Sequence, residues 1–315
     1  MPDTETVDVS ILIISFNTID LTRACLASVY AEAGDHSFEV IVVDNDSADG
    51  SAGMVRSEFP QATLFALDEN LGFGRANNLA AEHAAGDRVL LLNSDTVVLD
   101  GAIDRLLDFA DAHPEARVYG GRSLFADGSL NPTCCWGKPT LWNEFCLASG
   151  LSSVFAGSTF FNGRYLGDWQ RDSVREVDVI SGSYLLMDAP LWAQLEGFDT
   201  RFFMYGEDVD LCLRANQAGG QCLFTPASQI IHHGGGSERV VADKMVRLLK
   251  AKVQLYEKHW SRTRQWLGVR TLELWVLTRL VGHRARKLGR PSASSESWSA
   301  VWKARAEWRT PPAVS

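Results

Sequence analysis

The run VSILII at residues 9–14 decides the fold, because it is apolar apart from one serine and rich in β-branched side chains. Such a run predicts a strand buried on both faces, as in parallel sheets. A second run, FEVIVV at 38–43, predicts another strand of this kind. The segment 20–33 between them predicts a helix that begins near Asp20 and ends before Gly34. Strand, helix and strand in this order predict a parallel βαβ unit.

The same alternation continues along the chain and is punctuated by glycine and proline. We expect helices at 49–59, 72–85 and 101–113 and strands at 62–66 and 88–92. Farther on, we expect strands at 177–187, 221–225 and 228–232, helices at 189–196 and 207–218, and long loops with short helices, forming a lid, at 125–175. The predicted fold class is α/β, with a doubly wound, mostly parallel sheet.

Charge divides the 315 residues into two regions. The net charge is −9, but residues 239–315 carry 17 Lys and Arg against 5 Asp and Glu, whereas residues 1–238 carry 13 against 34. Six of the ten tryptophans also follow residue 239. We therefore expect a catalytic domain at 1–238 and a basic, Trp-rich helical C-terminal extension at 239–315.

Several protein classes are excluded by pattern. The N-terminus has no basic and apolar leader, and no run of about 18 uncharged apolar residues exists, so we expect neither a signal peptide nor a transmembrane helix. The six cysteines form no CxxC pair and are expected to be reduced thiols of a cytoplasmic protein. Nucleic-acid binding is not expected, because an acidic catalytic domain would repel phosphate.

The extension allows two interpretations. Residues 266–282 (WLGVRTLELWVLTRLVG) are strongly apolar but carry Arg270, Glu273 and Arg279, so they suit a helix lying in a membrane interface. Trp298 and Trp302, four residues apart, would present a second aromatic face. The extension would then place the protein peripherally on the inner face of the plasma membrane. The alternative is that these helices pack on the catalytic domain or on a second subunit of a homo-oligomer.

Polar residues follow three of the predicted strands, where parallel sheets bind ligands. They are Ser15 and Asn17 after the first strand, Asp44 and Asn45 after the second, and Asn93, Ser94 and Asp95 after the strand at 88–92. Asp44 and Asn45 could bond a pyrimidine edge and a ribose, or simply form a turn. Asp95 could hold Mg²⁺ or Mn²⁺ on a diphosphate, or belong to a loop that caps the next helix.

Two further clusters carry candidate chemistry. Glu207, Asp208 and Asp210 crowd the start of a helix, which favours carboxylates whether or not they act in catalysis. We expect the helix terminus to depress their pKa values, so that a base there would be ionised at pH 7. His232 and His233 follow a strand and precede a glycine run, so either could be a metal ligand beside a mobile loop.

These segments together resemble family 2 glycosyltransferases with the GT-A fold, and most closely the branch that includes bacterial rhamnosyltransferases. The matching stretches are ILIISFN (11–17), VIVVDNDSADGS (40–51), ENLGFGRANN (69–78), LLNSDT (91–96), VISGSYLLM (179–187), GFDTRFFMYGEDVDLCLRANQAG (197–219) and IIHHGGGS (230–237). They occur in the family's order and cover residues 9 to 237.

The resemblance implies a role for each matching position. Ser15, Asn17, Asp44 and Asn45 would line the nucleoside pocket, and Asn78 would be the donor-site asparagine. Asn93, Ser94 and Asp95 would form the DxD-type motif, with Asp95 and His232 as ligands of a divalent metal (Mg²⁺ or Mn²⁺). Glu207 and Asp208 would be the acidic pair, with Asp208 as the catalytic base. The first acidic position of DxD is Asn93 here, which removes one negative charge near the diphosphate.

The expected function is therefore inverting transfer of a sugar from a nucleoside diphosphate, with dTDP-rhamnose as the leading donor. The acceptor would be a hydroxyl of a cell-surface glycan or lipid-linked saccharide. Two alternatives stay open. A nucleotidyltransferase would need a Gly-rich, basic phosphate loop after the first strand, where this chain has SFNTIDLT. A nucleotide-sugar-binding protein could keep the fold without catalysing transfer, although it would not need the acidic pair.

Overall fold

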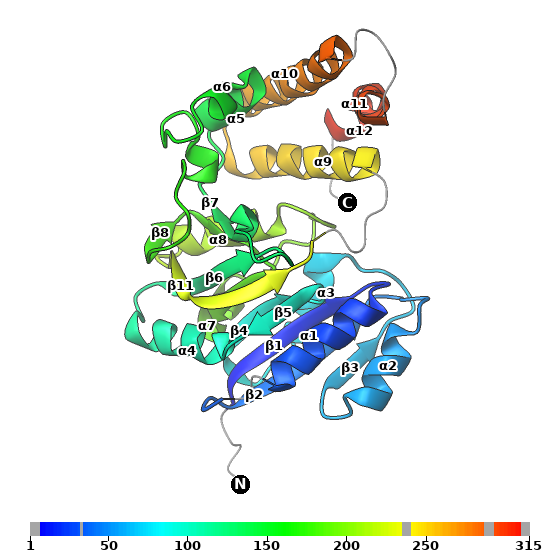
Figure 1. Cartoon of the computed structure of the whole chain (residues 1–315), viewed down its shortest axis with the longest axis vertical. Coiled ribbons are helices and arrows are strands. Elements are labelled where there is room, and N and C mark those ends of the chain that lie inside the picture. The colour runs from blue at the N-terminus through cyan, green and yellow to red at the C-terminus, as the bar shows by residue number, and fades with distance from the viewer. Residues whose placement is uncertain (1–6, 32–33, 235–240, 287–292, 310–315) are drawn as a thin grey trace. The chain divides into compact units, whose positions relative to one another are not determined.

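A computed structural model describes residues 7–31, 34–234, 241–286 and 293–309 (Figure 1). The chain forms two compact units. The sheet unit comprises Met1–Trp136, Gln170–Phe203 and Glu207–Ser237, and the helical unit comprises Gly137–Trp169, Met204–Gly206 and Glu238–Ser315. The domain boundary after residue 238 stays a prediction, and in the compact units residues 137–169 belong with the C-terminal helices. The glycine run predicted to be mobile lies, from residue 235, outside the described residues.

The sheet unit alternates strands and helices as the sequence predicts. Its strands are β1 (Val7–Ser15), β2 (Phe38–Asp44), β3 (Thr63–Ala66), β4 (Gly86–Asn93), β5 (Thr96–Leu99), β6 (Arg117–Leu124), β7 (Cys135–Trp136), β8 (Arg175–Val177), β9 (Val179–Ile180), β10 (Tyr184–Asp188) and β11 (Gln221–His232). Its helices are α1 (Ile19–Ala31), α2 (Ser51–Glu58), α3 (Phe73–Ala81), α4 (Ala102–Ala112), α7 (Ala189–Gln194) and α8 (Glu207–Gln217), with a short 3₁₀ turn at Pro132–Cys134.

The main sheet is mixed and mostly parallel on its N-terminal side. Its strand order is β3-β2-β1-β4-β10-β6-β11-β5, with β8 paired to β11 off this path. Strands β1 to β4 pair in parallel, whereas β10 runs antiparallel to both β4 and β6. The α/β, doubly wound, mostly parallel fold predicted from the sequence is therefore confirmed.

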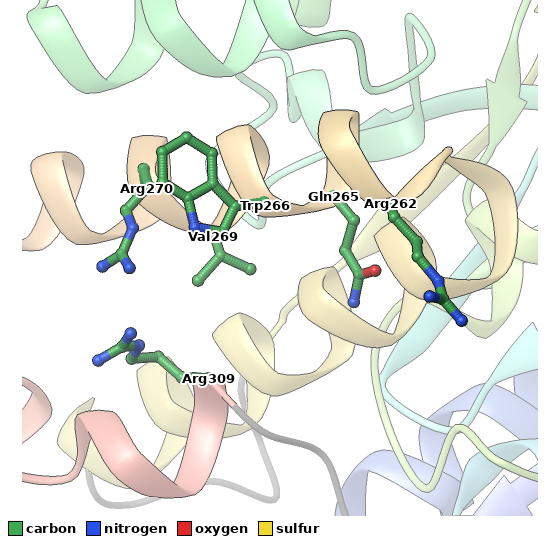
Figure 2. A pocket seen from close by; sticks show the side chains of 6 residues that line it. All are labelled: Arg262, Gln265, Trp266, Val269, Arg270 and Arg309. Atoms are coloured by element: carbon green, nitrogen blue, oxygen red, sulfur yellow. The ribbon is translucent and has the colours of Figure 1, made fainter.

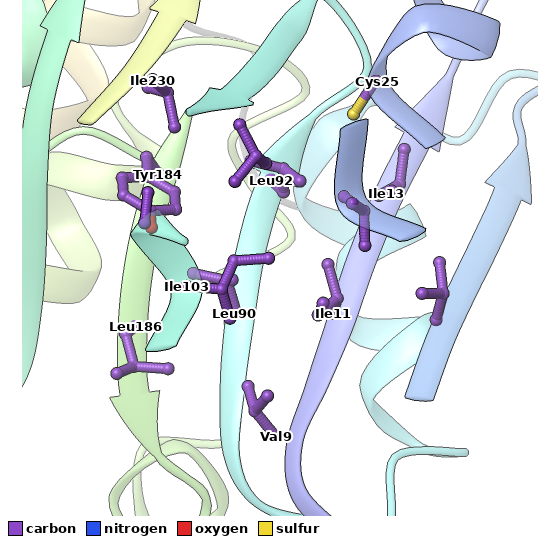
Figure 3. Close-up of a cluster of buried hydrophobic side chains, with 14 of the residues drawn as sticks. Val9, Ile11, Ile13, Cys25, Leu90, Leu92, Ile103, Tyr184, Leu186 and Ile230 are labelled. Carbon is purple, nitrogen blue, oxygen red and sulfur yellow. The ribbon is translucent and has the colours of Figure 1, made fainter. Parts of the chain in front are cut away.

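Both faces of the sheet are buried, as the unbroken apolar runs require. Ile11 and Ile13 of β1 join a core with Cys25 of α1 and Ile103 of α4 (Figure 3). Leu12 points to the opposite face because side chains alternate along a strand, and it too is fully buried. Helix α3 packs against β1 and β2, and α7 packs against β4 and β10. Layers on both faces leave the strand ends as the place for polar side chains.

Several strand predictions differ from the structure. The single strand expected at 177–187 is divided between the end of β8, β9 and β10, and the sequence analysis predicts no strand at β5, β6 or β7. Gly120 and Gly121 weaken the apolar pattern of β6, but a Cβ at Gly120 would collide with the Ile180 side chain. The two short strands expected at 221–225 and 228–232 are one strand, β11, whose register shifts between Thr225 and Gln229. Pro226 lies at that irregularity, where a missing N–H is tolerated.

The helical unit has a core of its own. It contains α5 (Leu141–Ser149), α6 (Leu151–Val154), α9 (Val241–His259), α10 (Arg262–Arg286), α11 (Ala293–Lys303) and α12 (Arg305–Arg309), with a 3₁₀ turn at Gly163–Tyr165. Tyr256, Val276 and Trp308 are almost completely buried in it. Lys252 of α9 and Glu144 of α5 form a buried ion pair of 2.7 Å. Helix α5, from the predicted lid, packs against α10.

Two further expectations concern this unit. The ring of Trp298 packs edge-on against Trp275 at 5.5 Å, and the aromatic face expected from Trp298 and Trp302 stays a prediction. Among the described residues, no helix is long and apolar enough to cross a membrane.

The six cysteines of the chain are free and buried, as expected for reduced thiols.

Candidate active site

Three of the predicted polar positions meet at one edge of the sheet. In the strand register, Ser15 at the end of β1 lies opposite Asp44 at the end of β2. Ile14, next to Ser15, lies opposite Asn93 at the end of β4. Adjacent parallel strands therefore deliver the predicted nucleoside and diphosphate residues to the same edge.

One carboxylate oxygen of Asp44 is buried without a hydrogen-bond partner among the described residues. The residue is 2% exposed, and its Oδ1 accepts a hydrogen bond from the Ser47 N–H at 3.0 Å. Within the described part of the chain, its buried Oδ2 has no hydrogen-bond partner. Burying a carboxylate oxygen without a partner is costly. A ligand N–H or O–H donor would satisfy this oxygen, which fits the predicted nucleoside contact.

Asn45 holds the neighbouring loop in place. Its Oδ1 accepts the Leu71 N–H at 2.8 Å, and its Nδ2 donates to Asn70 Oδ1 and to the Gly72 carbonyl. Because all of these partners belong to residues 70–72, Asn45 fixes the chain that enters α3. Its predicted contact with the nucleoside stays a prediction, and the structure adds a second role for the amide.

Ser15 and Asn17 are also engaged within the fold. Ser15 is fully buried, and its hydroxyl is 3.0 Å from that of Thr22 in α1. Thr22 in turn contacts Thr18, whose hydroxyl is 3.2 Å from that of Ser94. Asn17 adopts a left-handed backbone (φ 53°), and its Oδ1 accepts the Ala48 N–H. Both residues shape the loops at the sheet edge, while direct nucleotide contact remains untested.

Asn78 ties α3 to the segment before α8. Its amide accepts the Phe198 N–H at 2.8 Å and donates to the Phe198 carbonyl at 2.9 Å. Gly197 lies so close that a Cβ there would approach Asn78 Oδ1 to 2.5 Å, and its φ of 64° also disfavours a side chain. Both polar atoms of the Asn78 amide bond Phe198. The donor-site role of Asn78 stays a prediction.

The two predicted metal ligands are in contact. His232 Nε2 lies 3.2 Å from Asp95 Oδ1, and Asn93 Nδ2 lies 3.4 Å from the same nitrogen. Burial by itself raises the pKa of Asp95, but the hydrogen bond and charge of His232 outweigh it, and the pKa lies below its ordinary value. Adjacent ligands of an octahedral Mg²⁺, each about 2.1 Å from the ion, lie about 3 Å apart. The pair therefore fits two neighbouring positions on a divalent ion.

Other ligands would have to complete such a site. In the described residue ranges, no three His, Cys, Asp or Glu side chains gather closely enough to hold a metal ion. His233 is exposed, and its N–H donates to the Asp95 carbonyl. The geometry thus favours His232 over His233, and a bound diphosphate would supply the missing oxygens.

The acidic pair at the start of α8 is linked to this edge through the turn at 181–183. The Asn93 N–H donates to the Ser183 carbonyl at 3.1 Å, and the Gly182 N–H donates to Asp208 Oδ2 at 3.1 Å. The other oxygen of Asp208 accepts the Val209 N–H at 2.8 Å. The turn therefore fixes the Asp208 carboxylate beside the strand that ends in Asn93.

Glu207 and Asp210 occupy different environments from Asp208. Asp210 is fully buried and pairs with Arg214 at 2.7 Å, while Arg214 also donates to the carbonyls of Leu195 and Gly197. Asp210 is therefore part of the scaffold that anchors α8. Glu207 is 6% exposed, and its Oε2 has no hydrogen-bond partner among the described residues.

The expectation that the helix terminus depresses every pKa in this cluster is wrong for Glu207. Burial, followed by repulsion from Asp208, raises the pKa of Glu207 to about 8. Its desolvation outweighs the backbone hydrogen bond that favours the charged form. The protonated form of Glu207 is therefore favoured well above pH 4.5, the ordinary pKa of a glutamate. The protonated form of Glu207 is neutral, whereas the Asp208 carboxylate accepts two N–H groups.

Sequence reasoning missed the residues that connect these parts. Gly182 and Ser183 lie in the matching stretch VISGSYLLM but were assigned no role. The available signal was the Gly-Ser pair inside an otherwise apolar run, which marks a turn. Asn70 and Leu71, which form hydrogen bonds with the Asn45 amide, also lie in a matching stretch.

Comparison with known proteins agrees with this geometry. The model of "Glycosyl transferase family 2" matches residues 10–144. The N-acetylglucosaminyl-diphospho-decaprenol L-rhamnosyltransferase of Mycobacterium tuberculosis (strain ATCC 25618 / H37Rv) is 32% identical over 215 residues, which cover 64% of this chain and 68% of that protein. The chain belongs to glycosyltransferase family 2.

Other relatives support the same assignment. Rhamnosyltransferase WbbL of Escherichia coli (strain K12) is 26% identical over 254 residues, which cover 76% of this chain and 88% of that protein. The relatives place this family 2 member in the rhamnosyltransferase-like branch.

Solved structures agree on the GT-A fold. Mannosyltransferase PcManGT from Pyrobaculum calidifontis, in complex with GDP-Man and Mn²⁺, superposes with a TM-score of 0.58 at 15% identity, covering 96% of this chain and 88% of that one. GalNAc-T7 with UDP, GalNAc and Mn²⁺ gives a TM-score of 0.57 at 14% identity, covering 96% and 56%. At these identities the likeness concerns the fold alone.

Proposed function

We propose that this family 2 glycosyltransferase moves a sugar from a nucleoside diphosphate to a hydroxyl of a glycan or lipid-linked saccharide, with inversion at the anomeric carbon. The observation that carries the proposal is the link between the LLNSDT strand end and the acidic pair. Asn93 bonds Ser183, and the adjacent Gly182 bonds Asp208. A base and a diphosphate site fixed to one turn can hold the acceptor in line with the leaving group.

In the proposed single displacement, each group has one task. Asp208 takes the proton from the acceptor hydroxyl. The acceptor oxygen forms a bond to the anomeric carbon while the bond from that carbon to the diphosphate oxygen breaks. Asp44 Oδ2 receives a hydrogen-bond donor of the nucleoside. Asp95 and His232 would hold a divalent ion, which neutralises charge on the leaving diphosphate. Protonated Glu207 keeps negative charge low beside Asp208.

We favour dTDP-rhamnose as the donor because two of the relatives are named as rhamnosyltransferases. A lipid-linked acceptor is supported by the name of the M. tuberculosis relative, which acts on a diphospho-decaprenol compound. Such an acceptor suits a cytoplasmic enzyme held peripherally at the inner face of the plasma membrane. Association into a homo-oligomer also stays a prediction.

The test is thermal stabilisation across a panel of nucleotide sugars, with and without Mn²⁺, followed by transfer. A ligand that binds the folded state raises its melting temperature by mass action. We expect dTDP-rhamnose with Mn²⁺ to give the largest shift, and the product to have the anomeric configuration opposite to that of the donor. Retention of configuration would contradict the single displacement. Stabilisation without transfer or donor hydrolysis would favour the binding-protein alternative.

A further inference from the structure

The exposed apolar side chains of the described residues are concentrated in the helical unit. Large hydrophobic side chains with substantial exposure there are Trp142, Phe145, Val154, Phe155, Phe160, Tyr165, Trp266, Leu267, Leu274, Leu277 and Val281, compared with Phe125, Val174 and Phe203 in the sheet unit. Extended apolar surface on a folded protein marks an interaction site. The helical unit is also the unit that contains the basic extension.

One group forms an aromatic patch on and after α5. Trp142 contacts Phe145, Phe160 and Phe161, with ring centroids 5.0 to 6.0 Å apart, and Phe155 stacks on Phe161 at 4.7 Å. Phe160 is 63% exposed although it contacts two other rings. The rings support one another while leaving their outer surfaces in water, which is unfavourable for an isolated protein.

The second group is a stripe along α10. At about 100° per residue, Trp266, Leu267, Leu274, Leu277 and Val281 fall within an arc of about 100°. The opposite side of the helix carries Leu272, Val276 and Leu280, which are buried in the unit's core. Helix α10 is therefore apolar on two sides, and only one of them packs inside the unit.

The patch and the stripe belong to neighbouring helices. Thr278 of α10 donates to the Ala148 carbonyl of α5 at 3.0 Å, and Figure 1 shows α5, α6 and α10 next to one another. On α10, Thr278 lies about 20° from Leu267 at the edge of the stripe. On α5, Trp142 and Phe145 are exposed, while Glu144 and Ala148 face the unit's interior.

A basic pocket borders the Trp266 edge of the stripe, and its Arg270 falls within the arc of the stripe. Arg262, Gln265, Trp266, Val269 and Arg270 of α10 and Arg309 of α12 line a cavity of about 270 Å³ (Figure 2). Arg270 lies over the Trp266 ring at 5.4 Å, and Arg270 and Arg309 both pair with Glu273. Glu257 also accepts a hydrogen bond from Gln265 at 3.2 Å, so three guanidinium groups face two carboxylates and the pocket keeps a net positive charge.

We propose that this face of the helical unit docks on an anionic phospholipid membrane, with the aromatic patch and the α10 stripe in the lipid interface and the pocket arginines on lipid phosphates. Phe, Trp and Leu beside arginine match the boundary between acyl chains and anionic headgroups. The charge of the extension is complementary to such a surface: residues 239–315 carry 17 basic and 5 acidic side chains. Insertion would remove the exposed rings from water. The proposal does not depend on the sugar chemistry.

Sedimentation of the full chain with vesicles tests the proposal without donor or acceptor. We expect binding to vesicles of phosphatidylcholine with phosphatidylglycerol, weaker binding to phosphatidylcholine alone, and loss of binding at high salt. Arg262→Gln with Arg270→Gln should weaken the anionic binding by about fivefold per arginine, or on the order of 25-fold for the pair. The matched control is Arg23→Gln with Arg56→Gln, which removes the same charge from the sheet unit.

A second pair of variants tests the apolar contacts. Phe160→Ser should reduce partitioning at least severalfold on both vesicle types, because it removes an inserted ring. Phe125→Ser, which changes an exposed ring of the sheet unit, should leave it unchanged. Unaltered circular dichroism and melting temperature would show that each variant is folded. Equal loss in the Phe160 and Phe125 variants would overturn the proposal.

Other occupants of the face give different results. Absence of vesicle binding, together with a concentration-dependent dimer that Phe160→Ser abolishes, would assign the face to a second copy of the chain. Absence of vesicle binding, together with stabilisation by inorganic pyrophosphate that Arg262→Gln abolishes, would assign the pocket to a soluble anion. Either result refutes membrane docking.

Discussion

Replacing Asp208 with asparagine keeps the size of the side chain and removes its basicity, so the variant tests the proposed base directly. The structure defines what else changes. Asp208 accepts the Gly182 N–H at 3.1 Å and the Val209 N–H at 2.8 Å, one on each oxygen. Asparagine has a single acceptor oxygen, so one of these N–H groups would face an NH₂ group.

Two separate effects are therefore expected. Loss of a general base lowers kcat by about 10²–10⁴. Loss of one partly buried N–H partner lowers the free energy of unfolding by about 1–3 kcal/mol. Donor affinity should stay nearly unchanged, because the variant leaves Asp44, Asp95 and His232 untouched. Pre-steady-state transfer at saturating donor, together with calorimetric titration of the nucleotide, measures kcat and donor binding separately.

Glu207→Gln is the matched control, because Gln resembles the protonated form in which Glu207 mostly exists at pH 7. We expect its kcat at pH 7 to remain within about fivefold of the natural protein, since no ionised group is removed. An Asp208→Asn enzyme that keeps kcat within tenfold would refute the assignment of the base. A loss of more than 100-fold in Glu207→Gln alone would assign the base to Glu207.

Three further predictions follow from the same contacts. Exhaustive EDTA treatment should abolish transfer, and Mn²⁺ should restore it. Asp95→Ala and His232→Ala should weaken Mn²⁺-dependent donor binding in calorimetry. Full activity of the metal-free enzyme would contradict the metal role of both residues. Because the folded pKa of Glu207 is about 8 and its ordinary value is 4.5, its contribution to stability is complete below pH 4.5 and is lost as the pH rises towards 8. Glu207→Gln should thus raise the free energy of unfolding by up to a few kcal/mol at pH 9 and change it little at pH 4.5, as measured by urea titration. An identical effect at both pH values would contradict the raised pKa of Glu207. Gly197→Ala should lower the free energy of unfolding by about 2–4 kcal/mol in the same assay, because it adds a strained φ of 64° to a clash with Asn78. A loss under 1 kcal/mol would show that the Asn78 side chain moves aside at little cost.

The order of strands and helices around β1, β2 and β4 could be predicted because local patterns encode it. Unbroken apolar runs identify buried parallel strands, and proline or glycine ends the helices between them. Strand β6 escaped prediction because Gly120 and Gly121 are required by tertiary packing: a Cβ at Gly121 would meet the Ser228 backbone. The turn at 181–183, which precedes the antiparallel strand β10, likewise depends on partners far apart in the sequence, because Gly182 bonds Asp208 and Ser181 bonds Cys134.

The site was predictable to a similar extent and for a similar reason. Residues that directly follow strands, such as Asp44 and Asp95, could be placed at the sheet edge from topology alone. The hydrogen-bond partners of such residues could not be predicted, because they depend on loops such as 70–72, whose Leu71 N–H bonds Asn45. The raised pKa of Glu207 was missed because burial at the start of α8 is invisible in the pattern of charges.

The buried hydroxyls of Ser15, Thr22, Thr18 and Ser94 have a property that amides and carboxylates lack. In each contact of this series either oxygen can be the donor. The direction of all three hydrogen bonds can therefore reverse together by rotation of protons, with no movement of heavy atoms. If Ser94 turns its proton outward to a phosphate oxygen, Thr18 can donate to Ser94 and Thr22 to Thr18, and each bond polarises the next. The strand end would then respond to an arriving anion by reorienting dipoles within a rigid frame.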